Sequence, residues 1–221
     1  MGLIQRTTRP LTRDADSFRD DRLFILACDD TYAPKQYFDF FRITRVQVHV
    51  IETTDGTSSA PHVLERLEAI DHDDDDERWL ILDTDHCIQG SHLQTFTQTL
   101  KEAREKGVHV ALSKHCFELW LLLHHEDENA IKELKNADET EAALRVKLGE
   151  YNKRNLKQIH YPLTAVRDAI RRAERLDATV AGGDIPESNT SRVYQLWYSI
   201  LAKVNPTQCP SELVELLQKK K

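Results

Sequence analysis

Apolar and polar positions alternate in a regular order over the first 125 residues of the chain. Short apolar runs are typical of buried strands, and four are present, at about residues 23–28, 46–51, 78–83 and 108–112. Between them, apolar residues recur at helical spacing at about 34–43, 60–70 and 92–106. The run 117–125 is apolar on nearly every side, which indicates a buried helix. Strands separated by helix-length crossovers predict an α/β fold with a mostly parallel, four-stranded sheet flanked by helices.

The strand pattern stops after residue 125, and the rest of the chain is predicted to be helical. Amphipathic helices are expected at about 129–148, 162–176 and 186–204. The first twenty residues are polar and rich in Arg and Asp, so an irregular arm is expected there. The sequence therefore predicts an arm at 1–20, an α/β core at 21–125 and a helical C-terminal region at 126–221.

Composition narrows the class of protein. The chain has 221 residues, of which 40% are hydrophobic and 30% charged, as expected of a globular protein. No apolar run approaches the length of a membrane span, and the polar N-terminus does not resemble a secretory signal. The four cysteines lack CxxC spacing, which favours reduced thiols over disulfides or a zinc site. A cytoplasmic protein without a membrane partner is expected.

Charge is distributed unevenly along the chain. The net charge is −7, but residues 145–175 contain nine Lys and Arg against three acids, a net of +6. The remainder therefore carries −13, a balance that permits a basic face on an acidic body. A solvated helix surface explains the same numbers equally well.

Carboxylates follow two of the predicted strands. Asp29 and Asp30 follow the first strand, and Asp83 and Asp85 end the third. Residues i and i+2 of a strand point the same way, so Asp83 and Asp85 can converge on one point. Mg²⁺ and similar hard cations prefer carboxylate ligands, so Asp29, Asp83 and Asp85 predict a metal site at this sheet edge. The alternative is that these acids only cap the helices that follow. The acidic run 73–76 is expected to be a solvated loop.

One segment carries a family resemblance. The stretch Ser113-Lys114-His115-Cys116-Phe117-Glu118-Leu119-Trp120-Leu121-Leu122-Leu123-His124 resembles the RloB-like signature S-N-P-C-F-E-L-W-L-L-L-H. Cys28, Tyr37 and Phe38 keep the spacing of the family's first motif, C-E-G-x-x-T-E-x-x-Y-F. Asp83-Thr84-Asp85 is similar to the DxD motif of Toprim domains, and Tyr151-Asn152-Lys153 and Asn189-Thr190 resemble weaker C-terminal motifs. The resemblance covers nearly the whole chain after the arm.

The resemblance implies a fold and a function. It implies a Toprim-type core and a nuclease that cleaves phosphodiester bonds of DNA or RNA, tRNA included, in prokaryotic anti-phage defence or abortive infection. Asp83 and Asp85 would bind Mg²⁺ or Mn²⁺, and Asp29 would complete the site and relay a proton. The implied partner is an AAA/ABC-type ATPase encoded nearby, and a homo-oligomer is left open.

The chain departs from the family pattern near the predicted site. Asp29 and Asp30 replace the motif's Glu and Gly, and Ala33-Pro34 replaces its Thr-Glu. Asp is one methylene shorter than Glu, a difference that matters for site geometry. A catalytically impaired interaction subunit of a defence complex is therefore the second hypothesis. A phosphotransferase of the haloacid dehalogenase type is disfavoured, because no later strand offers the acids that it needs.

Basic residues and one buried acid complete the candidates. The residues expected to contact nucleic acid are Lys114, Lys153, Arg154, Arg167 and Arg171, with Tyr151 placed to stack a base. Exposed lysines, a solvated helix face or a protein-docking surface are the competing interpretations. Glu118 lies within an apolar block, so it either orients a site residue or acts as a buried structural acceptor, which is favoured. For His124, a hydrogen bond in the core is favoured over catalysis.

Overall fold

The computed structural model describes residues 21–30, 32–53, 56–85 and 92–217 of the chain. The expected N-terminal arm at 1–20 lies outside the described residues. Strand β1 spans Arg22–Cys28, β2 Val46–Val50, β3 Glu77–Asp83, β4 His109–Lys114 and β5 Thr190–Ser191. The sheet has the order β2-β1-β3-β4-β5, and every pairing is parallel except β4 with β5. The predicted α/β fold with a mostly parallel sheet is confirmed.

The sheet has five described strands rather than the four predicted. The additional strand, β5, is only two residues long and pairs with Ser113 and Lys114 at the edge. Both of its residues are polar, so no apolar run or alternation marks it in the sequence. It brings the C-terminal part of the chain into the sheet.

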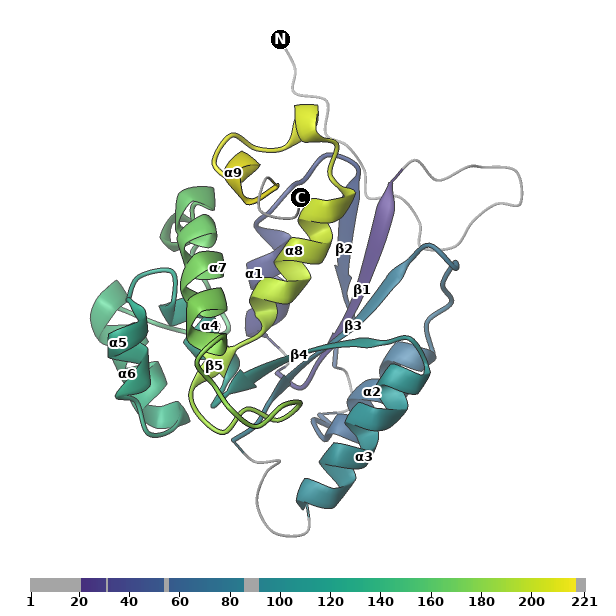
Figure 1. Cartoon of the computed structure of the whole chain (residues 1–221), viewed down its shortest axis with the longest axis horizontal. Coiled ribbons are helices and arrows are strands. Elements are labelled where there is room, and N and C mark those ends of the chain that lie inside the picture. Colours follow the sequence, from purple (N-terminus) through teal and green to yellow (C-terminus); the bar gives the residue numbers. More distant parts are fainter. Residues whose placement is uncertain (1–20, 31, 54–55, 86–91, 218–221) are drawn as a thin grey trace.

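Helices cover both faces of the sheet (Figure 1). The helices of the α/β part are α1 (Ala33–Asp39), α2 (Ala60–Glu68), α3 (His92–Glu105) and α4 (Phe117–Leu122). Those that follow are α5 (Glu128–Lys132), α6 (Ala137–Leu148), α7 (Leu163–Asp177), α8 (Val193–Lys203) and α9 (Val214–Leu217). Short 3₁₀ turns lie at Gln158–His160 and Pro206–Gln208. No described helix has the length and apolar character needed to span a bilayer.

Alternating strand side chains build two cores, one on each face. Phe24 and Leu26 of β1 pack in a cluster with residues of α1, α4, α7 and α8, whereas Leu23 and Ile25 pack with residues of α2 and α3. This alternation follows from the two-residue period of a strand. Because α7 and α8 share the first cluster, the C-terminal helices form one layer of the same packed structure.

Two predicted helices differ from the structure. The segment 129–148 is divided into α5 and α6, because Asn136 caps α6 by accepting a hydrogen bond from the Glu139 amide at 2.8 Å. The Glu139 side chain accepts in turn from the Lys135 amide at 2.9 Å, an exchange close to a capping box. The helix predicted from Pro186 begins instead at Val193, because residues 190–191 pair with β4.

The strand order places a topological switch between β1 and β3. From β1 the chain crosses to β2 on one side, and β3 and β4 then add on the other side. Right-handed crossovers consequently put α1 on one face and α2 and α3 on the other. At such a point the loops at the carboxyl ends of the strands separate and leave a crevice in which ligands bind.

Candidate functional site

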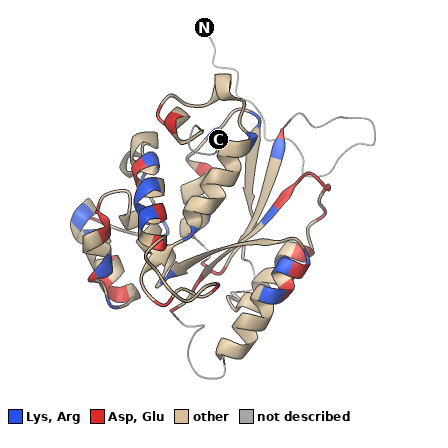
Figure 2. Ribbon diagram, viewed as in Figure 1, with Lys and Arg blue, Asp and Glu red and all other residues tan. Residues whose placement is uncertain are grey.

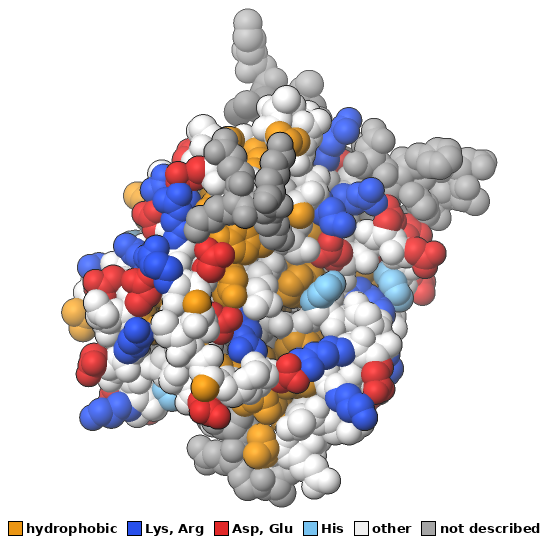
Figure 3. Space-filling model, in the orientation of Figure 1, with side chains coloured by type: hydrophobic (Ala, Val, Ile, Leu, Met, Phe, Trp, Pro, Cys, Tyr) orange, Lys and Arg blue, Asp and Glu red, His pale blue; other side chains and the backbone are white. Residues whose placement is uncertain are grey.

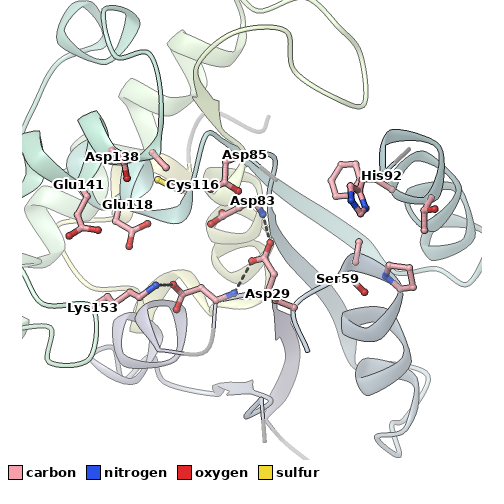
Figure 4. A pocket seen from close by; sticks show the side chains of 17 residues that line it. Asp29, Ser59, Asp83, Asp85, His92, Cys116, Glu118, Asp138, Glu141 and Lys153 are labelled. Atoms are coloured by element: carbon pink, nitrogen blue, oxygen red, sulfur yellow. Dashed lines mark hydrogen bonds and ion pairs between the residues drawn. The ribbon is translucent and has the colours of Figure 1, made fainter. Parts of the chain in front are cut away.

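The candidate site lies at the carboxyl ends of β1 and β3, at the switch between them. Asp29 follows β1 directly, Asp83 is the last residue of β3, and Asp85 follows two residues later. All three side chains line a pocket of about 430 Å³. Figure 4 shows their carboxylates close together at the strand ends. The structure therefore brings the predicted acids to one place.

The pocket is strongly acidic. Seven of its lining residues are acids, and Lys153 is the one Lys or Arg among the described residues that line it. The acids come from strand ends, from α4 and from α6, and they are Asp29, Asp30, Asp83, Asp85, Glu118, Asp138 and Glu141. The opposite wall carries Ser59 at the start of α2 and His92 at the start of α3.

Asp29 joins the ends of the two central strands. Its Oδ2 accepts a hydrogen bond from the Asp83 amide at 2.7 Å, and its Oδ1 accepts from the Asp30 amide at 2.8 Å. Burial raises the pKa of Asp29 to about 7, although the two amide hydrogen bonds act in the opposite direction. Asp29 can therefore exchange a proton near neutral pH.

Asp83 carries a buried oxygen that lacks a partner. Its Oδ1 is inaccessible to solvent and has no hydrogen-bond partner among the described residues. Burial raises the pKa of Asp83 well above its usual range, and the negative charges of Asp29 and Glu118 raise it further. A buried carboxylate in this state must be protonated or must meet a cation, because an unpaired buried charge is costly.

The donor set fits a hydrated divalent cation. Mg²⁺ keeps several waters and takes one or two carboxylates directly, so Asp83 and Asp85 suffice as ligands. Asp29, Asp83 and Asp85 do not form a tight cluster: among the described residues, the three acids whose oxygens all lie within 4.8 Å of one another are Asp73, Asp75 and Asp76. That second cluster is on the loop before β3, where Asp75 pairs with Arg22 in an exposed position.

Glu118 lies in the pocket wall with a dedicated hydrogen-bond donor. It is 6% exposed, and its Oε1 accepts a hydrogen bond from the Tyr151 hydroxyl at 2.8 Å. Burial raises the pKa of Glu118, and the Tyr151 hydrogen bond acts in the opposite direction. Burial also raises the pKa of the adjacent Cys116 thiol, so this sulfur is a poor nucleophile. Glu118 is thus a buried acceptor that also contributes charge to the pocket.

Lys153 lines the pocket, and Arg154 follows it in the sequence. The Lys153 Nζ is 3.4 Å from Asp30 Oδ2. The other oxygen of Asp30 accepts from the amides of Tyr32 and Ala33 at 2.6 and 2.9 Å, which fixes the start of α1. The Arg154 guanidinium lies over the Tyr32 ring, 4.7 Å from its centroid.

The other predicted nucleic-acid contacts lie elsewhere and have partners within the chain. Lys114 donates to the carbonyl oxygens of Pro186 and Glu187 at 3.3 and 2.9 Å. Arg167 and Arg171 pair with Glu215 at 3.2 and 2.8 Å, and Figure 2 shows acids interleaved with the basic residues of α7. None of these three residues lines the pocket, and their role in binding stays a prediction.

The surface shown in Figure 3 is mixed in charge. Lys and Arg side chains alternate with Asp and Glu over this face, with no continuous basic area on it. The basic face and the solvated helix surface considered for residues 145–175 both stay predictions.

Several features of the site were not predicted from the sequence. Asp138 and Glu141 on α6 and His92 on α3 carry no motif. Asp138 lies in the first turn of α6, where acids are common for electrostatic reasons alone. Only the packing of α6 beside α4 brings Asp138 and Glu141 to the pocket. The favoured role of His124 is confirmed: its Nδ1 donates to the Trp120 carbonyl at 2.9 Å, and its Nε2 accepts from the Tyr37 hydroxyl at 3.0 Å.

Comparison with known proteins gives a family match. The family model described as RloB-like protein matches residues 24–199, from β1 to α8. No curated protein and no solved structure matches the chain significantly. The matched range contains both strand ends of the pocket, α4, α6 and Lys153. Since it also spans most of the chain, the protein belongs to the RloB-like protein family.

Proposed function

We propose that this protein is a metal-dependent nuclease with a Toprim-type site. The observation that carries the proposal is the buried, unpartnered oxygen of Asp83 in an acidic pocket at the switch point of the sheet. A hard divalent cation satisfies this oxygen and neutralises the surrounding carboxylates. The resemblance of Asp83-Thr84-Asp85 to the Toprim DxD motif supports the same assignment.

Each residue of the pocket has a distinct role in the proposed hydrolysis. Asp83 and Asp85 would hold Mg²⁺ or Mn²⁺, and a bound ion would supply activation of water and neutralisation of charge on phosphate oxygens. Asp29 accepts and returns a proton during hydrolysis, because its pKa of about 7 leaves both protonation states accessible at neutral pH. Lys153 holds a substrate phosphate at the edge of the pocket. Glu118 maintains the negative potential around the cation.

The cellular setting is part of the same proposal and rests on the family. We place the nuclease in the cytoplasm as an effector of anti-phage defence, restrained or activated by an ATPase encoded nearby. Cleavage of DNA, RNA or tRNA is compatible with the site, and so is a homo-oligomer. The broad layer of C-terminal helices offers surface for a protein partner.

A non-catalytic interaction subunit is the second candidate. Both oxygens of Asp29 accept backbone hydrogen bonds, which favours a structural role for the residue that replaces the motif's Glu. The three acids are also more widely spaced than those at 73–76. This candidate predicts weak metal binding and no hydrolysis.

Cleavage assays with matched variants separate the two candidates. Supercoiled DNA, single-stranded DNA and total tRNA are incubated with Mg²⁺ or Mn²⁺, with and without the ATPase. Asp83→Asn is the test variant, and Asp75→Asn in the second acidic cluster is the control. Cleavage by the wild type and by Asp75→Asn, lost in Asp83→Asn, supports the nuclease. Absence of cleavage under every condition, together with no calorimetric Mn²⁺ binding, refutes it.

A further inference from the structure

An exposed aromatic residue and an arginine form a stacked pair beside the pocket. Tyr32 lies between β1 and α1 and is 37% exposed, which is high for a large apolar residue in this protein. The guanidinium of Arg154, on the loop after α6, lies 4.7 Å from the centroid of the Tyr32 ring. Arg154 forms no ion pair with any carboxylate in the described part of the chain, so its charge is available to a ligand.

The Gln36 side chain holds the pair in place through hydrogen bonds to the backbone near both residues. Gln36 donates to the Lys153 carbonyl at 2.7 Å and to the Tyr32 carbonyl at 3.0 Å, and its Oε1 accepts from the Leu156 amide at 2.9 Å. One side chain of α1 thereby ties the loop that carries Arg154 to the segment that carries Tyr32. A flat surface fixed in this way loses little entropy when a ligand stacks on it.

Charge limits where a polyanion can approach the site. Apart from Lys153, the Asp, Glu, Lys and Arg residues described as lining the pocket are all acids. A phosphate therefore approaches most favourably past Lys153 and Arg154, which are neighbours in sequence. The Tyr32–Arg154 pair lies on this side, adjacent to Asp30 and Lys153.

We propose that Tyr32 and Arg154 form a stacking site for an unpaired nucleobase, with Lys153 on the neighbouring phosphate, so that the substrate is single-stranded nucleic acid. Base–aromatic stacking needs a free base face, and a base inside a duplex has neighbours on both faces. Arginine extends such a stack through its planar guanidinium. The proposal rests on the proposed nuclease only for the fate of the strand, because binding itself needs no hydrolysis.

The structure favours a different aromatic residue for stacking from the one expected from the sequence. Tyr151 was the predicted stacking residue, but its hydroxyl donates to Glu118 and its ring packs against the core. Tyr32 has the exposure that Tyr151 lacks. The two residues have different partners, Glu118 for Tyr151 and Arg154 for Tyr32, so substitutions can separate their roles.

Binding of short oligonucleotides tests the proposal. A strand containing 2-aminopurine is titrated in Ca²⁺ as single-stranded DNA, as single-stranded RNA and as a duplex, with anisotropy and base fluorescence as readouts. We expect tighter binding of at least one single strand than of the duplex, with quenching of the base. Tyr32→Leu should weaken binding roughly 5- to 150-fold and abolish quenching. Tyr32→Phe should preserve both, and Arg154→Lys should keep the charge but lose part of the quenching.

Controls make each outcome decisive. Lys101→Ala removes an exposed charge on α3, paired with Glu105 at 3.8 Å, and should leave binding unchanged. Equal affinity of Tyr32→Leu and wild type, preference for the duplex, or no binding of any strand overturns the stacking site. A Mn²⁺ cleavage assay is run in parallel. Tyr32-dependent binding with neither cleavage nor calorimetric Mn²⁺ binding refutes only the nuclease, whereas cleavage that is indifferent to Tyr32→Leu refutes only the stacking site.

Discussion

Mn²⁺ is expected to stabilise the folded protein more at about pH 8 than at about pH 5.5, and Asp83→Asn should remove most of this effect. The pKa values of Asp29 and Asp83 are both raised, chiefly by burial. These two carboxyls therefore bind more protons in the folded state than in the unfolded chain above about pH 4, and their contribution to stability without metal falls as the pH rises. A cation competes with those protons, so it binds best where the carboxylates are ionised.

The structure sets the size of the effect. The pKa of Asp29 rises from 3.8 to about 7, a change of about three units, and each unit corresponds to about 1.4 kcal/mol. Ionising Asp29 alone thus costs about 4 kcal/mol of folding free energy, lost between about pH 4 and pH 7. Free Mn²⁺ at about one hundred times its Kd returns about 2.7 kcal/mol. For a chain of this length that is a Tm increase of about 5–10 °C.

Thermal unfolding followed by circular dichroism measures this increase. Wild type, Asp83→Asn and Asp75→Asn are compared in EDTA and in Mn²⁺ at both pH values. Asp75→Asn is the matched control, because it alters the exposed acidic cluster that also has the spacing to hold a metal. We expect it to retain the full increase at the higher pH.

Two results would refute the reasoning. An increase that disappears in Asp75→Asn and persists in Asp83→Asn would move the metal to the loop before β3. An increase of equal size at both pH values would mean that the raised pKa values of the pocket acids play no part in binding.

Three further predictions concern single residues. His124 has its pKa lowered to about 3, chiefly by burial, so about 5 kcal/mol of stability should be lost as the pH falls from about 6.5 to 3. Urea unfolding should show a smaller loss in His124→Gln. Tyr151→Phe leaves the Glu118 carboxylate without its donor and should cost about 1–3 kcal/mol at neutral pH, measured by chemical denaturation. Asp29→Glu carries the carboxylate away from the two amides and should also cost about 1–3 kcal/mol, while calorimetry should show tighter Mn²⁺ binding. Unchanged or weaker Mn²⁺ binding would count against metal coordination from this position.

Local pattern was enough to predict the centre of the fold. The four parallel strands are short apolar runs because both faces of the sheet are covered, and burial of this kind is visible in a short window. The acids that follow these strands come together because parallel strands bring their carboxyl ends to one edge of the sheet. The sequence alone therefore predicts that Asp29, Asp83 and Asp85 lie together.

Features created by tertiary packing could not be predicted in this way. Strand β5 is two polar residues that become a strand only because β4 offers a free edge. Asp138 and Glu141 are ordinary acids in the N-terminal part of α6 until that helix packs beside α4. Tyr32 gives no sequence signal, because its exposure and its contact with Arg154 depend on a loop about 120 residues away. The break between α5 and α6 is different, because the spacing of Asn136 and Glu139 is visible in the sequence, although a single helix over 129–148 was predicted.

The replacement of the motif's Glu by Asp29 changes which residue decides the function. A side chain of this length reaches the Asp83 amide and joins the ends of β1 and β3, so its carboxylate is held at the backbone. Asp83 is then the acid of the pair that still lacks a partner, because its buried Oδ1 has no hydrogen bond among the described residues. Burial raises the pKa values of Asp29 and Asp83, so these two carboxyls favour either a proton or a divalent cation at physiological pH. Protons produce a rigid but inert pocket suited to an interaction subunit, whereas a cation produces a hydrolytic centre. Which of the two occupies Asp83 at neutral pH therefore decides between these functions.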